Sequence, residues 1–355
     1  MIGARINQAR KAAGLSLRAL AEKARISAMA ISKYETGKST PSSGVLLSLA
    51  KALDVRTEYF FRPIKVELRE VEYRKLFKLP AKVLQQIEGD VLEQIERFLE
   101  LERYFPKGPL QEFKLPENLP AKISSYAEIE EVASKLRRDW NLGGDPIPVL
   151  TDMLEERGVK VFQSQAFHGD AFDGMAALVN GIPVIVVGSG WPGDRQRLTL
   201  AHELGHLILK GRLATDVEEE IAANRFAGAF LVPDSEVRKE LGERRTWLEP
   251  KELAVLKKSY GLSMGGWMHR AKDLGILTDA HYLEMVKFFR ARGWHKKEPG
   301  EPFPAEQPQL FEQLVFHALA EDLIGESKAA ELLRVSLIKF QAMRNMGHAR
   351  TTAGH

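Results

Sequence analysis

The sequence of 355 residues contains no cysteine, which excludes disulfide bonds, thiolate metal sites and cysteine nucleophiles. A metal site would therefore have to use carboxylates and some of the nine histidines. Long apolar runs are also missing, because the longest, Ile182 to Val187, is far shorter than the ~20 residues that cross a bilayer. The N-terminus has no apolar signal-peptide core. We therefore expect a cytoplasmic protein without a membrane partner.

Neither sign of charge dominates the whole chain, whose formal net charge is +3 with 28% charged and 44% hydrophobic residues. This balance is typical of globular proteins, and the length predicts two or three domains at about 150 residues each. The charge is unevenly distributed, however. Residues 1–65 contain twelve Lys and Arg but four Asp and Glu, a local charge of +8. The first domain is therefore the candidate for a nucleic-acid partner.

Residues 17–35 have the pattern of two short helices joined by a tight turn. Ser16 and Ser27 are favourable N-caps for helices over 17–24 and 28–35, and Gly37 ends the second helix. Such a pair is a helix-turn-helix, whose second helix can enter the major groove of double-stranded DNA. The side chains expected to contact DNA are Arg18, Ser27, Ala28, Met29, Ser32, Lys33 and Lys38.

This stretch resembles the Xre/lambda-repressor-like DNA-binding domain. The resemblance rests on Leu17-x-x-Leu20-Ala21, Ile26-Ser27, Ile31-Ser32-x-x-Glu35-x-Gly37-x-x-x-Pro41 and Leu49-Ala50-x-Ala52-Leu53. It implies an all-α DNA-binding domain over residues 1–65. Arg25 stands where the turn of that family usually has glycine, so we expect a strained backbone there. The alternative is a helical interaction domain that no longer binds DNA.

Residues 66–120 are expected to form one long amphipathic helix, over 81–105, and a Pro-rich linker. Apolar residues recur in the helix at steps of three and four from Leu84 to Phe105. This stripe either packs on its own chain or forms the seam of a homodimer. The interruption at Gln94 leaves both interpretations open.

Residues 121–298 combine helical and strand patterns. Helices are predicted over 126–141 and 148–157, and strands over 159–163, 174–179 and 182–187. Asn180-Gly181 between the last two strands predicts a hairpin with a type I′ turn. This part is therefore an α+β domain with a small sheet.

A second Pro-rich stretch, residues 299–308, is expected to isolate a helical C-terminal segment over 309–348. Its pattern from Ser327 to Phe340 resembles a further small helix-turn-helix or a packing clip. We expect this segment to serve an interaction rather than to read DNA. The chain is thus predicted to have several domains.

The sequence His202-Glu203-Leu204-Gly205-His206 is an H-E-x-x-H motif within a helical pattern. Histidines at positions i and i+4 lie on one helical face, so both imidazoles can bind one metal ion. Glu203 can accept a proton from a water that the metal has acidified. Gly205 is costly within a helix, which predicts that another backbone approaches closely there.

A third ligand is needed, and the nearby candidates are Asp216, Glu218, Glu219 and Glu220. A buried helix is predicted over 217–231. We expect Glu218 and Arg225 to face solvent on one stripe of this helix. Glu220 and Asn224 share another stripe, so Glu220 is the preferred ligand, Asn224 its hydrogen-bonding support, and Glu219 the next choice.

Two segments resemble the ImmA/IrrE family of zinc metallopeptidases. They run from Trp191-Pro192-Gly193 to His206, and from Glu220-x-x-x-Asn224-Arg225-Phe226-Ala227 to Leu231-Val232-Pro233. The resemblance covers residues from about 125 to 300 and implies a zincin-like domain with Zn²⁺ as cofactor. It implies His202, His206 and Glu220 as metal ligands and Glu203 as the catalytic residue. Because these proteins are known to cleave Xre-type repressors, it also implies a regulatory protein as substrate.

The predicted function is a DNA-binding zinc endopeptidase that cleaves a repressor or other regulatory protein in a stress or mobile-element response. Arg195 is expected beside the site, either stabilising the oxyanion of the reaction or forming a structural ion pair. The strand over 174–179 is a candidate for pairing with an extended substrate. The alternatives are a transcriptional regulator whose peptidase-like domain senses a ligand or metal, and a scaffold with a structural ion. Glu203 favours the peptidase, because a sensor needs no base beside two metal histidines.

Overall fold

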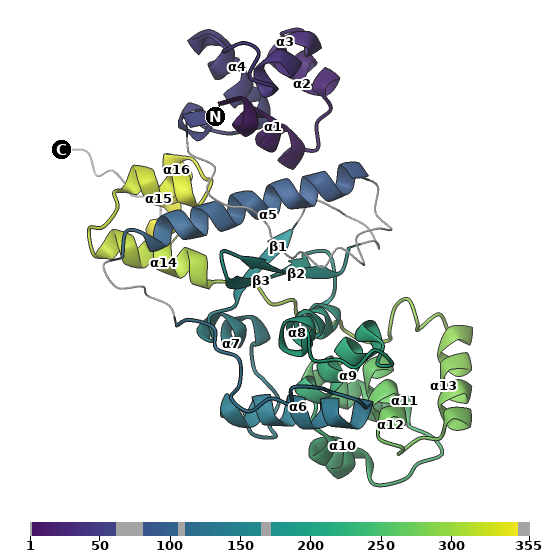
Figure 1. Cartoon of the computed structure of the whole chain (residues 1–355). Coiled ribbons are helices and arrows are strands. Elements are labelled where there is room, and N and C mark those ends of the chain that lie inside the picture. The colour runs from purple at the N-terminus through teal and green to yellow at the C-terminus, as the bar shows by residue number, and fades with distance from the viewer. Residues whose placement is uncertain (1, 62–80, 106–110, 165–171, 347–355) are drawn as a thin grey trace, which may run out of the picture. The chain divides into compact units, whose positions relative to one another are not determined.

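The computed structural model describes residues 2–61, 81–105, 111–164 and 172–346. Residues 66–80, 106–110 and 347–348, which belong to the predicted linker and C-terminal segment, lie outside them. The chain divides into unit 1 (residues 1–67, 88–111 and 308–355) and unit 2 (residues 68–87 and 112–307). Figure 1 shows a mainly helical chain with one small sheet, which confirms the predicted fold class. No helix in the described ranges is long and apolar enough to cross a membrane.

The N-terminal part of unit 1 is the predicted all-α domain. It comprises α1 (Ile2–Ala12), α2 (Leu17–Ala24), α3 (Ala28–Glu35), α4 (Ser43–Leu53) and the 3-10 helix η1 (Thr57–Phe61). Ser16 caps α2 and Ser27 caps α3, each accepting a hydrogen bond of 3.1 Å from the backbone three residues on. Arg25, between these helices, has the left-handed conformation with a φ of 55°. The predicted caps and the strained turn are therefore confirmed.

The rest of unit 1 is built on α5 (Ala81–Glu102), whose residues from Glu88 onward belong to this unit. The C-terminal helices α14 (Leu310–Ala320), α15 (Glu326–Leu332) and α16 (Leu337–Arg344) belong to the same unit. Ile87, Val91, Phe98 and Leu101 of α5 are buried. The apolar stripe of α5 thus packs within its own chain, which is the first of the two interpretations drawn from its periodicity.

The sheet of unit 2 has three strands, β1 (Lys160–Ser164), β2 (Gly174–Val179) and β3 (Ile182–Gly188), in the order β1-β3-β2. β2 pairs with β3 in antiparallel fashion, and β1 pairs with β3 in parallel. Asn180 and Gly181 have φ angles of 52° and 83°, which confirms the hairpin and its turn of positive φ. Within the part of the chain that the structure describes, β2 is an edge strand.

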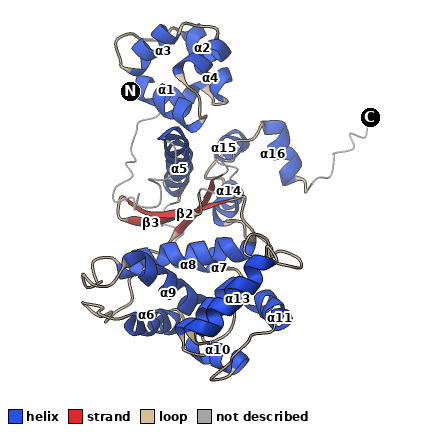
Figure 2. Ribbon diagram, turned by 90° about the vertical axis from the view of Figure 1, so that its right-hand side faces the viewer, coloured by secondary structure: helices blue, strands red, loops and turns tan. Residues whose placement is uncertain are grey.

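Helices cover this sheet and extend away from it. They are α6 (Tyr126–Asp139), α7 (Leu150–Glu156), α8 (Gly193–Leu209), α9 (Glu219–Leu231), α10 (Asp234–Leu241), α11 (Pro250–Tyr260), α12 (Met264–Asp273) and α13 (Asp279–Ala291). α8 contacts β2 and β3 as well as α9, and it lies between the sheet and α9 in both ribbon views (Figure 2). This central position explains why nearly every residue of α8 is buried.

The Pro-rich stretch over 299–308 ends where the chain divides, because residue 307 belongs to unit 2 and residue 308 to unit 1, so it separates the C-terminal helices from the preceding domain as predicted. The Glu306 carboxylate forms an ion pair with Arg197 of α8 and accepts a hydrogen bond of 2.8 Å from the backbone of Thr151. The carbonyl of Phe303 accepts a hydrogen bond of 2.9 Å from Gly193, the first residue of α8. Residues 303–306 are therefore attached to the helix that carries the H-E-x-x-H motif, and they belong to unit 2.

Candidate metal centre and DNA-binding surface

The candidate metal centre lies where α8 and α9 cross. Gly205 faces the backbone of α9, since a Cβ there would lie 3.4 Å from the Cα and carbonyl oxygen of Ala223 and 3.0 Å from Phe226. The predicted close approach of another backbone is therefore confirmed. The close contact of the two helices brings the histidines of α8 next to the acidic first turn of α9.

His202, His206 and Glu220 form the group of possible metal ligands in the described residues. The two Nε2 atoms lie 3.0 Å apart. The Glu220 carboxylate oxygens lie 3.4 Å from Nε2 of His206 and 3.6 Å from Nε2 of His202. Zinc bonds of about 2.0–2.1 Å at tetrahedral angles place neighbouring ligand atoms about 3.3 Å apart. The three donors therefore fit a single zinc ion, and their His₂Glu chemistry is one that zinc accepts.

The other nitrogen of each imidazole faces a polar group of α9. Nδ1 of His202 lies 2.9 Å from Oδ1 of Asn224. When Nδ1–H donates to this amide oxygen, the ring keeps the Nε2 lone pair available for a metal. Nδ1 of His206 lies 3.4 Å from a carboxylate oxygen of Glu219. Glu219 and Glu220 are adjacent in sequence, but only Glu220 faces both Nε2 atoms.

Glu203 points to the sheet rather than to α9. It is 3% exposed, and its Cγ would lie 3.5 Å from a Cβ built on Gly174, the first residue of β2. That Cβ would also come within 2.5 Å of Thr199 and 2.8 Å of the carbonyl oxygen of Val186. Glycine is therefore required for β2 to pass this close to α8. The H-E-x-x-H motif thus directs two histidines to α9 and one carboxylate to an edge strand.

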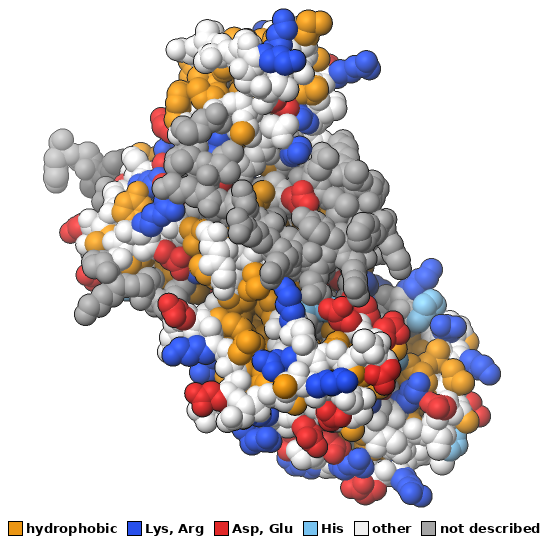
Figure 3. All heavy atoms as spheres, in the orientation of Figure 1, with side chains coloured by type: hydrophobic (Ala, Val, Ile, Leu, Met, Phe, Trp, Pro, Cys, Tyr) orange, Lys and Arg blue, Asp and Glu red, His pale blue; other side chains and the backbone are white. Residues whose placement is uncertain are grey.

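The candidate DNA-binding surface is formed by α2, α3 and the loop after them. Arg18, Ser27, Met29, Lys33 and Lys38 are exposed, and Ala28 and Ser32 are partly exposed. Figure 3 shows Lys and Arg side chains projecting from this domain with few acidic neighbours. The structure therefore presents all seven predicted DNA contacts to solvent.

The end of α3 is attached to α1. The Glu35 carboxylate accepts hydrogen bonds from Arg10, at 2.6 Å and 2.8 Å, and from Asn7 at 2.7 Å. Both partners lie on α1, so these bonds hold the second helix of the motif in place. The positive charge of Arg10 therefore compensates the negative charge of Glu35.

Two comparisons with known families match this architecture. Residues 6–60 match the helix-turn-helix family, and residues 154–272 match a peptidase family described as the IrrE N-terminal-like domain. The chain joins a helix-turn-helix domain to an IrrE-like peptidase domain. None of the curated proteins compared with the chain matches it. The predicted fusion is confirmed, and the candidate metal centre lies inside the segment matched as IrrE-like.

Arg195 of the IrrE-like domain forms the ion pair that was one of its two predicted roles. Its guanidinium lies 2.8 Å from the Asp173 carboxylate and stacks on the ring of Trp191, 3.3 Å from the ring centroid. Asp173 precedes Gly174, so this pair attaches the start of β2 to the first turn of α8. A role of Arg195 in the reaction remains a prediction.

An ion-pair network that the sequence did not reveal holds α9 in the IrrE-like domain. Glu130 of α6 accepts hydrogen bonds from both Arg225 of α9 and Arg270 of α12. Arg270 is 1% exposed and also donates 3.0 Å to the carbonyl of Val232. Arg225 pairs with Asp273 as well, at 3.2 Å. The expectation that Arg225 faces solvent is wrong, because three helices meet around its guanidinium.

Proposed function

We propose that this chain is a DNA-binding zinc endopeptidase that cleaves a transcriptional repressor or another regulatory protein. The observation that carries the proposal is the convergence of three metal donors beside a buried glutamate. His202, His206 and Glu220 would hold Zn²⁺, and Glu203 would act as the general base. The IrrE-like match supports the peptidase class.

When bound at this centre, zinc would supply the Lewis acidity that polarises a peptide carbonyl and acidifies water. The carboxylate of Glu203 would accept a proton from the attacking water and deliver it to the leaving amine. Its burial between α8 and β2 limits competition from solvent. Asn224 would orient the His202 ring through the 2.9 Å contact at Nδ1.

The substrate would bind as an extended segment along β2. This strand is an edge strand and begins at Gly174, next to Glu203. In strand addition the substrate is held by main-chain hydrogen bonds, which would place one of its peptide bonds near the proposed base and would require no pocket for a particular side chain. The resemblance to the ImmA/IrrE family supports an Xre-type repressor as the target, in a stress or mobile-element response.

The N-terminal domain would bind double-stranded DNA through α3, as supported by the helix-turn-helix match. We further propose a cytoplasmic location, where DNA and a repressor substrate are both accessible. A homodimer on a two-fold operator remains a proposal, and its contacts would lie elsewhere than the buried stripe of α5.

A transcriptional regulator that senses a ligand or metal without proteolysis is the alternative function. One experiment separates the two. The zinc-loaded full chain is incubated with a candidate Xre-type repressor, with and without chelator, and the fragments are identified by mass spectrometry. We expect one zinc-dependent cut. Repressor that stays intact while metal loading alters DNA binding would favour the sensor.

Three adjacent carboxylates allow the metal ligand to be tested with matched variants. Replacement of Glu220 by Gln should lower zinc affinity by about 100-fold or more, because a direct ligand is lost. Replacement of Glu219 by Gln should cost about 10-fold, because Glu219 faces Nδ1 of His206 and supports a ligand without being one itself. Glu218, which is exposed, should tolerate the change without effect. Competition with a chromogenic chelator gives the three affinities. Equal losses in the Glu219 and Glu220 variants would contradict the assignment.

Lys33 tests the phosphate contacts of the N-terminal domain. Replacing it with Ala should weaken binding to DNA and reduce the slope of log K against log salt by about 1. The matched control is Lys287→Ala, an equally exposed lysine on α13 of unit 2, which should leave the slope unchanged. Fluorescence anisotropy between about 50 and 200 mM salt measures both slopes. If Lys33→Ala leaves the slope unchanged, Lys33 does not contact a phosphate of the DNA.

A further inference from the structure

The turn between α15 and α16 repeats the turn between α2 and α3. Arg25-Ile26-Ser27 of the first corresponds to Arg334-Val335-Ser336 of the second. The two arginines have φ angles of 55° and 56°, a conformation that is uncommon outside glycine. Their backbone amides donate to the carbonyls of Glu22 and Glu331, at 3.3 Å and 3.1 Å.

The next amide in each turn makes an equivalent bond as well. Ile26 donates 3.1 Å to Ala21, and Val335 donates 3.0 Å to Ala330. The two turns therefore have the same residue type at the strained position and the same backbone hydrogen bonds.

The second helices also correspond, position by position. Ser27 and Ser336 are both N-caps, accepting bonds of 3.1 Å and 3.2 Å from the backbone three residues on. The fourth residue is the single buried one in each helix, Ile31 in α3 and Phe340 in α16. The second residue of each is a large exposed apolar side chain, Met29 at 69% and Ile338 at 82%. α15 and α16 thus form a helix-turn-helix with the burial pattern of the N-terminal one.

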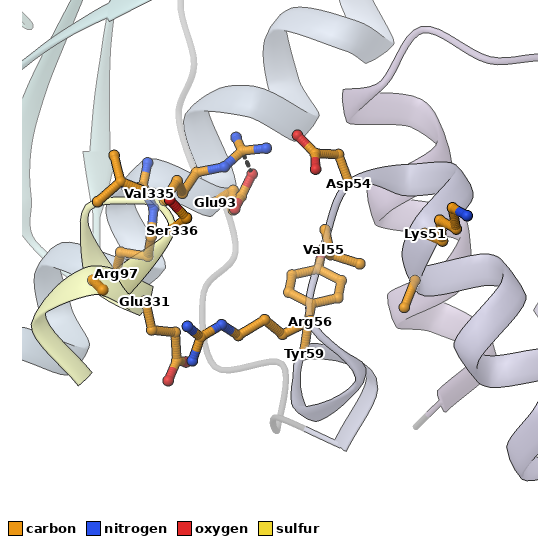
Figure 4. Close-up of a pocket in the computed structure, with 13 residues that line it drawn as sticks. Lys51, Asp54, Val55, Arg56, Tyr59, Glu93, Arg97, Glu331, Val335 and Ser336 are labelled. Carbon is orange, nitrogen blue, oxygen red and sulfur yellow. Dashed lines mark hydrogen bonds and ion pairs between the residues drawn. The ribbon is translucent and has the colours of Figure 1, made fainter. Parts of the chain in front are cut away.

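α15, the turn and one side chain of α16 attach this motif to the rest of unit 1. Arg334 pairs with Glu93 of α5 at 3.0 Å, and Lys328 pairs with Glu100. Arg97 of α5 donates 2.6 Å to the carbonyl of Leu332. Figure 4 shows this side, where the turn and α5 line a cavity of about 390 Å³ together with residues between 50 and 59 of the N-terminal domain. α16 contributes Phe340, which stacks on Phe316 of α14, and leaves its other face exposed.

The exposed face of α16 has the chemistry of a DNA-reading helix. From Leu332 to Arg350 the sequence contains no Asp or Glu, and Lys339 is an exposed basic residue of α16. Arg334, in the turn, pairs with Glu93 of α5, and Arg344 pairs with Glu326 of α15. Ile338 and Gln341 are exposed on α16, and the Gln341 amide donates 3.1 Å to the carboxylate of Glu326 on α15, a bond that DNA contact would replace. A glutamine amide can bind adenine in the major groove, and an apolar side chain can contact the methyl group of thymine. An acidic protein partner would match the charge but not the repeated helix-turn-helix geometry.

In place of the interaction role expected from the sequence, we propose that α15 and α16 form a second DNA-binding helix-turn-helix, which contacts DNA through the exposed face of α16. The chain would then hold DNA at two motifs in unit 1 rather than at one. This inference is independent of the peptidase activity of unit 2, and it does not require the N-terminal motif to bind DNA.

The absence of cysteine provides a direct test on the full chain. Ile338→Cys introduces a single thiol on α16, to which an iron–EDTA cleavage reagent can be coupled. Met29→Cys is the matched variant on α3, and Leu283→Cys, 54% exposed on α13 of unit 2, is the control. Each labelled protein is bound to end-labelled duplexes of random sequence, and strand cleavage is measured. We expect cleavage from Ile338→Cys and from Met29→Cys at several times the level from Leu283→Cys.

Cleavage from Met29→Cys but not from Ile338→Cys would overturn the proposal while leaving the N-terminal domain as a DNA reader. Cleavage from Ile338→Cys alone would support it and would contradict the role proposed for α3. Cleavage from neither would overturn both.

A charge reversal gives a second, label-free test. Lys339→Glu should reduce the salt slope of binding to the same duplexes by about 1 or more, whereas Lys287→Glu should not. Circular dichroism verifies that both variants fold. An unchanged slope combined with a changed oligomeric state in light scattering would identify α16 as a protein-binding surface and overturn the proposal.

Discussion

Replacing Glu203 with glutamine is expected to reduce cleavage of the target protein by about 100- to 10,000-fold, the usual contribution of a general base. Glutamine has nearly the same size and would fill the same buried position between α8 and β2. It cannot accept the proton of the attacking water. Because Glu203 is not among the three proposed ligands, zinc content should not change. Initial cleavage rates at saturating zinc, together with metal analysis of the same samples, measure both quantities.

Asp216→Asn is the matched control, since it also removes one negative charge near α9 but from an exposed residue. It should cleave at the wild-type rate. Cleavage by the Glu203→Gln protein at that rate would show that Glu203 is not the base. Loss of zinc from this variant would instead place Glu203 among the ligands and contradict the proposed division of roles.

Local features of this protein were predictable because they depend on near neighbours in the chain. Ser16 and Ser27 cap helices through bonds to residues three positions on, and Asn180-Gly181 forms a turn by its own backbone preference. The strand over 174–179 was predicted with the bounds that β2 has. The parallel pairing of β1 with β3 was not predictable in this way, because the alternation of apolar residues within a strand does not determine which strand it pairs with.

The choice between Glu219 and Glu220 shows where sequence reasoning reaches its limit. Adjacent residues on a helix point about 100° apart, so either carboxylate could face the histidines until α8 is placed. Gly205 fixes that placement by allowing α9 to approach. In the structure, Glu220 then faces Nε2 of both histidines, and Glu219 faces Nδ1 of His206.

Long-range ion pairs were not predictable at all. Arg225 belongs to a polar stripe of α9, and its partner Glu130 lies on α6, almost a hundred residues earlier. Glu306 lies in a Pro-rich segment whose composition is typical of a linker, and it pairs with Arg197 of α8. Each pair depends on helices that meet only in the folded domain. These ion pairs hold α8 and α9, the two helices of the proposed metal centre. The sequence therefore predicted the candidate ligands but not the ion pairs that position them.

Removal of the Glu130 carboxylate is expected to be among the most destabilising single changes in unit 2. Glu130→Ala leaves the guanidinium groups of Arg225 and Arg270 without their shared partner, and Arg270 is 1% exposed. Breaking a buried ion pair costs about 3–5 kcal/mol of unfolding free energy. Because the Glu130 side chain is 15% exposed, we expect the lower end of this range, about 3 kcal/mol. For a unit of this size, Tm should fall by roughly 10 °C.

The experiment can observe unit 2 alone, because all five tryptophans of the chain lie in it. Tryptophan fluorescence during urea unfolding, with chelator present so that zinc does not mask the loss, gives the free energy of unfolding. The neighbouring Glu131→Ala is the control, since Glu131 is exposed and its removal should change that energy by less than about 0.5 kcal/mol. Glu130→Gln should fall between the two, because its amide oxygen can still accept one hydrogen bond but carries no charge. Equal stability of the Glu130→Ala and Glu131→Ala proteins would mean that the arginines find other partners and that the network does not hold α9 against α6 and α12.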